Sequence, residues 1–109
     1  IINNTDRKIG HLLPLDQERV LGCDHGVTFH TEDKLRTVLW QWAGLPLDEA
    51  EKSDLRKLLS KLESGETEIA KLITATEFQA LLVRIAHLIS TCEFPSPSED
   101  WPAVPWPPF

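Results

Sequence analysis

The sequence predicts a small α+β domain that is mainly helical, with one short β-hairpin ahead of about four helices. Brief apolar runs at residues 11–15 and 19–23 flank a polar turn, which is the pattern of a hairpin. From residue 31 to residue 89, leucine, isoleucine and aromatic residues recur at helical spacing. Because a lone two-stranded hairpin is not stable in water, we expect it to pack on these helices or on other sequence.

The hairpin is expected to be short. Its first strand contains Pro14, which has no N–H to donate to a neighbouring strand. Val20, Leu21 and Cys23 continue the apolar pattern after the turn at residues 16–19. The sequence therefore predicts an edge-type hairpin.

Two helices are expected in the middle of the chain. The first begins at the N-cap Thr31, with acidic residues in its first turn, and stops at Gly44 before Pro46. The second begins at Asp48, where Glu51 lies three residues later, and ends at residues 64–65. Both carry an apolar stripe that predicts burial of one face.

Two further helices are expected before the chain becomes rich in proline. Residues 69–73 predict a short helix, and Thr76 with Gln79 predicts a capping box for a strongly amphipathic one that continues to Ile89. We therefore divide the chain into a domain at residues 1–93 and a tail at 94–109. The tail contains Trp101 and Trp106 among six prolines, and we expect it to fold back onto its own domain.

Composition excludes several classes of protein. The 109 residues carry a formal net charge of −6 and no stripe of Lys and Arg, which argues against general nucleic-acid binding. No apolar run is long enough for a membrane span. The two distant cysteines, Cys23 and Cys92, are expected to be free thiols of a cytoplasmic protein. The chain has no Met and begins at Ile1, so we expect it to be part of a longer protein, with an exposed apolar face that favours a dimer.

Two aspartates carry most of the chemical information. Asp6 lies 18 positions before Asp24, and the predicted hairpin lies between them. Phosphoryl transfer requires one carboxylate to orient the attacking hydroxyl and another to hold magnesium. Taken singly, Asp6 also fits a helix cap or an ion pair with Arg7 or Lys8, and Asp24 also fits a turn before Gly26.

Histidines and cations surround these aspartates. His11 could complete a metal site with Asp24, or it could be a structural histidine at the start of a strand. Together with His25 and His30, the group could suit zinc or manganese. Lys34 and Arg36 could meet the negative charge of a substrate or pair with acidic neighbours.

The two short motifs resemble a known family. Asp6-Arg7-x-x-x-His11 and Asp24-His25-Gly26 resemble the catalytic loop and the metal-binding Asp-x-Gly of phosphatidylinositol 3- and 4-kinases. The wider run to Trp40 is similar to a group of uncharacterised actinobacterial proteins related to those kinases. The match covers about residues 1–46, and the remainder fits the helices of a kinase-like C-terminal lobe.

The resemblance implies a role for each matched residue. Asp6 and Arg7 would be the catalytic residues of the loop, and Lys8 would bind the cofactor. Asp24 would hold the metal, and His11 stands where the family has a metal-ligating Asn. The segment 27–36 would be a shortened activation or substrate loop.

The function that the resemblance implies is an ATP- and magnesium-dependent phosphotransferase, with manganese as an alternative metal and zinc as a weaker one. Its acceptor is an unidentified hydroxyl group. This chain would supply the C-terminal catalytic portion and be inactive alone, because the sequence has no Gly-rich phosphate loop and no lysine-bearing strand before the catalytic loop. A missing N-terminal lobe of the same protein would then be a partner. Two alternatives are a pseudokinase or protein-interaction module and a metal-dependent hydrolase that uses Asp6, His11, Asp24 and His25.

Overall fold

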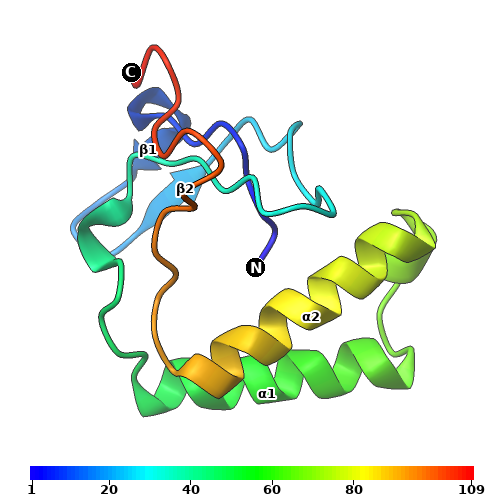
Figure 1. The fold of residues 1–109 in the computed structure, drawn as a ribbon. Helices are drawn as coiled ribbons and strands as arrows, with labels where there is room; N and C mark the ends of the chain where they lie inside the picture. The colour runs from blue at the N-terminus through cyan, green and yellow to red at the C-terminus, as the bar shows by residue number, and fades with distance from the viewer.

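A computed structural model describes all 109 residues and shows two parts, a pair of antiparallel helices and a largely irregular part that carries the hairpin (Figure 1). The C-terminal tail leaves the helices and returns to the irregular part, so that the C-terminus lies near the hairpin (Figure 1). The elements, in chain order, are the 3-10 turn η1 (Ile9–His11), strands β1 (Leu12–Pro14) and β2 (Val20–Gly22), the 3-10 turn η2 (Trp40–Trp42), helix α1 (Glu49–Ser64), the 3-10 turn η3 (Ile69–Lys71) and helix α2 (Ala75–Thr91).

The expected hairpin is confirmed. Strands β1 and β2 pair in antiparallel fashion, with Leu13 opposite Leu21 at the centre. Pro14 pairs with Val20 at the turn end of this two-stranded sheet, where its missing N–H disrupts no central ladder. At the turn, the Asp16 side chain accepts hydrogen bonds from two backbone N–H groups, at 3.0 and 2.9 Å.

Capping boxes begin both α-helices. In α1 the predicted box is present, because Glu51 N–H donates to Asp48 Oδ1 at 2.7 Å and Asp48 N–H donates to Glu51 Oε2 at 2.8 Å. In α2 the prediction from Thr76 and Gln79 is wrong. The box lies two residues earlier, at Thr74 and Glu77. The charged carboxylate of Glu77 interacts more favourably with the positive end of the helix dipole than the neutral amide of Gln79 would.

The apolar core lies between the two α-helices. Its buried members are Leu47, Leu55, Leu62, Leu81 and Ile85. Phe29 and Phe94, from segments outside the helices, pack against this cluster. The hairpin contributes nothing to it, since all three residues of β2 are exposed.

Two expected helices are absent, so the α+β fold has two α-helices rather than about four. The segment that begins at Thr31 is irregular up to η2, because its backbone bonds to distant segments rather than to itself. Arg36 N–H donates to Asn4 O, Val38 N–H to Arg7 O, and Thr37 N–H to Ala103 O. The expected helix at residues 69–73 is only the single turn η3.

The tail is irregular, as expected, and packs on its own chain. Ala103 O accepts hydrogen bonds from Thr37 N–H at 3.0 Å and from Trp40 Nε1–H at 2.7 Å. Pro105 is among the most completely buried side chains of the molecule. Neither α-helix has the length and apolar character needed to cross a membrane. Cys23 and Cys92 are unpaired, as predicted.

Candidate functional site

The two acidic motifs are joined by the side chain of Arg7. Arg7 is only 8% exposed, and its Nη1–H donates to His11 O at 3.2 Å and to Cys23 O at 2.8 Å. Cys23 directly precedes Asp24, so the loop that carries Asp6 and the turn that carries Asp24 share one buried guanidinium. The backbone of Arg7 is fixed as well, since it forms a parallel bridge with Thr37.

Asp6 lies between two cations. Its Oδ1 is 3.4 Å from Arg36 Nη2, and its Oδ2 is 3.9 Å from Lys8 Nζ. Asp6 N–H donates to Asn4 Oδ1 at 2.9 Å, which fixes the turn just before the carboxylate. The expected ion pair with Lys8 is therefore present, although Arg36, 30 residues away in sequence, is nearer.

Asn3 holds the segment at residues 30–34, and no motif in the sequence marks it as a functional residue. It is 3% exposed and has a left-handed backbone, with φ of 52°. Its Nδ2–H₂ donates to His30 O and Glu32 O, and its Oδ1 accepts from Lys34 N–H. One buried amide thus holds the stretch that was expected to begin a helix. Its burial could not be predicted from the sequence, because Asn3 stands in a run of residues that are typical of exposed loops.

Asp24 extends into solvent from a left-handed turn. Its φ is 54°, a conformation that Asp tolerates better than most residues, and its side chain is 60% exposed. His11 Nε2 lies 3.5 Å from Asp24 Oδ2, and His11 Nδ1 accepts a long hydrogen bond from Lys8 N–H at 3.5 Å. In neutral His11 the proton is therefore assigned to Nε2, which points to Asp24.

These contacts form a series between the two aspartates. It runs from Asp6 to the Lys8 side chain, from the Lys8 backbone to one nitrogen of His11, and from the other nitrogen to Asp24. Every member of the series is a residue that the sequence motifs single out. The arrangement can orient a hydroxyl at Asp6 and present carboxylate oxygen at Asp24.

Gly22 provides space for His25 beside Arg7. A Cβ atom added at Gly22 would lie 3.2 Å from His25 Nε2 and 3.6 Å from Arg7 Nη1. Sequence reasoning missed this position, which carries no functional group of its own.

His30 is engaged elsewhere. Its Nδ1 accepts from Glu32 N–H at 3.0 Å. No group of three or more His, Cys, Asp or Glu side chains is arranged to hold a metal ion.

Lys34 and Arg36 meet the tail as well as acidic neighbours. Lys34 Nζ is 3.4 Å from Glu32 Oε2 and 4.9 Å from the centre of the Trp101 ring. Arg36 Cζ is 6.0 Å from the same ring centre. No local sequence pattern indicates this contact, because Trp101 lies 65 residues after Arg36.

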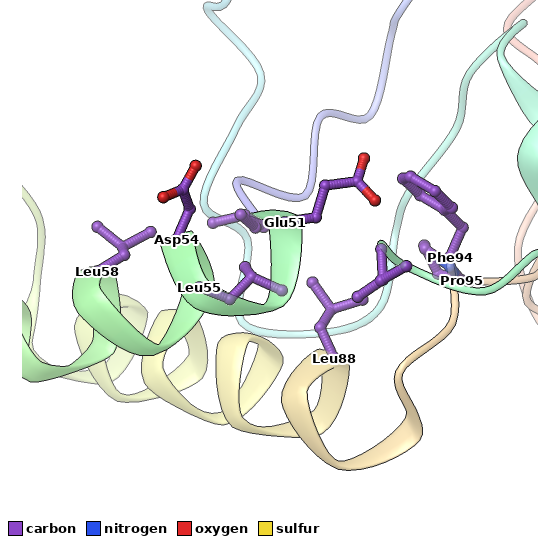
Figure 2. A pocket seen from close by; sticks show the side chains of 9 residues that line it. Glu51, Asp54, Leu55, Leu58, Leu88, Phe94 and Pro95 are labelled. Carbon is purple, nitrogen blue, oxygen red and sulfur yellow. The ribbon is translucent and has the colours of Figure 1, made fainter. Parts of the chain in front are cut away.

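Two cavities lie away from Asp6 and Asp24. One, of about 370 Å³, lies between α1 and the segment after α2 (Figure 2). Figure 2 shows the carboxylates of Glu51 and Asp54 above an apolar floor that includes Leu55 and Leu88. The other, of about 580 Å³, is lined in part by Arg84 and His87 of α2. Burial lowers the pKa of Arg84 from its ordinary value, while nearby Asp33 acts in the opposite direction.

Comparison with known proteins gives one curated relative. The chain is 42% identical over 110 residues to Protein Rv2133c of Mycobacterium tuberculosis. The match covers the whole chain and 39% of that protein, so the chain spans about two fifths of the length of this relative. No family model matches the sequence. No solved structure matches it either.

Proposed function

We propose that these residues form the C-terminal catalytic portion of an ATP- and magnesium-dependent phosphotransferase related to phosphatidylinositol 3- and 4-kinases. The observation that carries this proposal is the buried Arg7 guanidinium. It bonds to the carbonyl group before Asp24 while its own backbone follows Asp6. The backbone segments that carry the two carboxylates, which phosphoryl transfer requires, are therefore tied together by one side chain.

Asp6 would orient the acceptor. Its carboxylate would accept a hydrogen bond from the acceptor hydroxyl and direct the oxygen toward the γ-phosphorus of ATP. A bond forms between that oxygen and phosphorus as the bond to the ADP oxygen breaks, and the hydroxyl proton passes toward Asp6. Arg36 and Lys8 keep the carboxylate in place for this step.

The residues at Asp24 fit magnesium. Magnesium in phosphotransferases is held by one or two carboxylates, completed by phosphate oxygens and water. Asp24 offers an exposed carboxylate, and His11 lies beside it in a position to orient it. When bound, the metal would neutralise charge on the phosphates. The same donor set is too small for a protein-held zinc ion, which takes at least three protein ligands, so the hydrolase alternative has less support.

The nucleotide-binding lobe would lie outside these residues. Kinases clamp the phosphates with a Gly-rich loop and a lysine on a strand, neither of which precedes the catalytic motif here. The relative from Mycobacterium tuberculosis is long enough to include such a lobe, because the match covers only 39% of it. We therefore expect activity from the longer protein and not from these residues alone.

A pseudokinase or interaction module is the second candidate. His11 occupies the position where the resembling kinases have a metal-ligating Asn, and the hairpin exposes the apolar side chains of Leu13, Val20 and Leu21. Such a surface favours contact with another lobe or a second copy of the chain.

Calorimetry on the full-length protein that contains these residues would separate the candidates. We expect ATP to bind only with magnesium, and Asp24→Asn to weaken binding by about tenfold or more, since it removes the charged oxygen. Asn also tolerates the left-handed backbone of this position. Asp54→Asn, on the exposed face of α1, is the matched control and should bind normally. No binding of magnesium and ATP by the intact protein would favour the pseudokinase instead.

A further inference from the structure

We propose that the C-terminal tail positions Asp6, with Trp101 acting through Arg36. The inference rests on the proposed function only in naming Asp6 as the group that orients the acceptor. The contact itself is a property of the fold. Through this contact the tail becomes a structural part of the site.

Arg36 bonds to the loop at residues 4–7, which carries Asp6. Its Nε–H donates to Thr5 O at 2.7 Å, and its Nη2 reaches Asp6 Oδ1 at 3.4 Å. Its backbone N–H donates to Asn4 O, and its carbonyl accepts from Arg7 N–H, both at 3.1 Å. Arg36 thus bonds to four successive residues of the loop, and its side chain makes the contact with the carboxylate.

Trp101 restrains the Arg36 side chain. A cation within about 6 Å of an indole ring centre is attracted by the negative face of the ring. Arg36 Cζ lies at 6.0 Å and Lys34 Nζ at 4.9 Å from the Trp101 ring centre. The two like charges therefore share one aromatic side chain, which offsets their repulsion and limits the conformations of Arg36.

The tail fixes Trp101 against the same part of the molecule. Ala103 O accepts hydrogen bonds from Thr37 and Trp40, which follow Arg36 in the chain. Further along, Pro108 O accepts from Ile9 N–H at 2.9 Å, three residues after Asp6. These anchors act on both sides of the loop. The partner found for Asp24 is His11, which lies outside the tail, so the contact of Trp101 with Arg36 does not reach Asp24 directly.

The proposal predicts separate effects on order, turnover and affinity. In the full-length protein, Trp101→Leu should make the Arg36 Nε–H exchange with solvent about two to five times faster, as expected from loss of a partly exposed cation–π contact. Magnesium-dependent hydrolysis of ATP, with water as the acceptor, should fall in kcat by a similar factor. The affinity for ATP and magnesium should stay unchanged.

Matched variants distinguish positioning from general packing. Trp101→Phe keeps an aromatic face and should restore most of the slow exchange and the turnover. Trp106→Leu alters an 85% exposed tryptophan of the same tail and should change neither. In an Arg36→Gln background, which has no cation at this position for the indole ring, Trp101→Leu should lower turnover no further.

Different results would overturn the positioning role of Trp101 and the phosphotransferase proposal. Unchanged Arg36 exchange in Trp101→Leu, or equal effects of Leu and Phe, would overturn the positioning role. An equal loss of turnover and nucleotide affinity would overturn it too, since that pattern marks general damage to the fold. If Trp101→Leu does not fold, Trp101→Met, which keeps apolar volume without an aromatic face, takes its place in the same exchange measurement, and unchanged Arg36 exchange in that variant would overturn the positioning role. If exchange responds as expected but the unmodified protein binds no ATP, the positioning contact stands and the phosphotransferase proposal fails.

Discussion

Replacement of Arg7 by Ala should destabilise the protein far more than its charge alone suggests. Arg7 is buried, and no Asp or Glu carboxylate lies within 4.0 Å to pair with it. Its main bond is to Cys23 O at 2.8 Å, and loss of a hydrogen bond from a charged donor costs about 1.5–3 kcal/mol. His11 O loses less, because it keeps the hydrogen bond from Cys23 N–H. Adding the buried stem of the side chain, we expect a loss of about 2–4 kcal/mol in the free energy of unfolding.

Urea denaturation measures this directly. With a slope of about 2 kcal/mol per molar urea, typical of a small domain, the midpoint should fall by about 1–2 M. Arg7→Lys should recover up to half of the loss, since a single ammonium can reach Cys23 O but has no guanidinium fork.

Arg19→Ala is the matched control. Arg19 forms a 2.7 Å ion pair with Asp16, but its side chain is 72% exposed, and such pairs contribute less than about 1 kcal/mol. If Arg7→Ala and Arg19→Ala shift the midpoint equally, the side chain of Arg7 does not join the Asp6 loop to the Asp24 turn.

Three further predictions follow from named contacts. Gly22→Ala should displace the His25 ring, because the new Cβ would lie 3.2 Å from His25 Nε2, and unchanged His25 ring resonances in NMR spectra would refute this. Trp40→Phe should cost about 0.5–1.5 kcal/mol through loss of its 2.7 Å bond to a tail carbonyl, whereas Trp101→Phe removes a buried indole N–H that has no partner and should cost less in thermal unfolding. The pKa of Glu77 is held below its ordinary value of 4.5, chiefly by the backbone N–H of the N-cap residue of α2, so its contribution to stability is present above pH 4.5 and is lost as the pH falls through the lowered pKa. Acid unfolding followed by circular dichroism should show this step, and Glu77→Gln should remove it.

Local signals predicted some elements well. The Asp48–Glu51 box and the stop at Gly65 lie within a few residues of the helix that they delimit, and both are present in α1. The hairpin, too, follows from alternation and a turn that are adjacent in sequence. Interactions between neighbours in sequence are visible without a structure.

The main prediction that was wrong, the helix after Thr31, concerns a segment whose partners are distant in sequence. The segment after Thr31 has the spacing of a helix, but its backbone N–H groups bond to Asn4, Arg7 and Ala103, which are remote in sequence. Tertiary bonds therefore override the local preference. The candidate site divides in the same way, because the motifs indicate Asp6 while its nearest cation, Arg36, comes from this same misjudged segment.

The separation of the apolar core from the site has a consequence for how the molecule loses its structure. The five core side chains lie between α1 and α2, whereas Asp6, Arg7 and Asp24 are held by backbone bonds, one guanidinium and the returning tail. Regions with few buried apolar contacts open at lower free energy than the core around them. Warming or mild denaturant should therefore disorder the segments that carry Asp6 and Asp24 while the helix pair remains folded, so that a helical signal would overstate the fraction of molecules in which these segments are ordered.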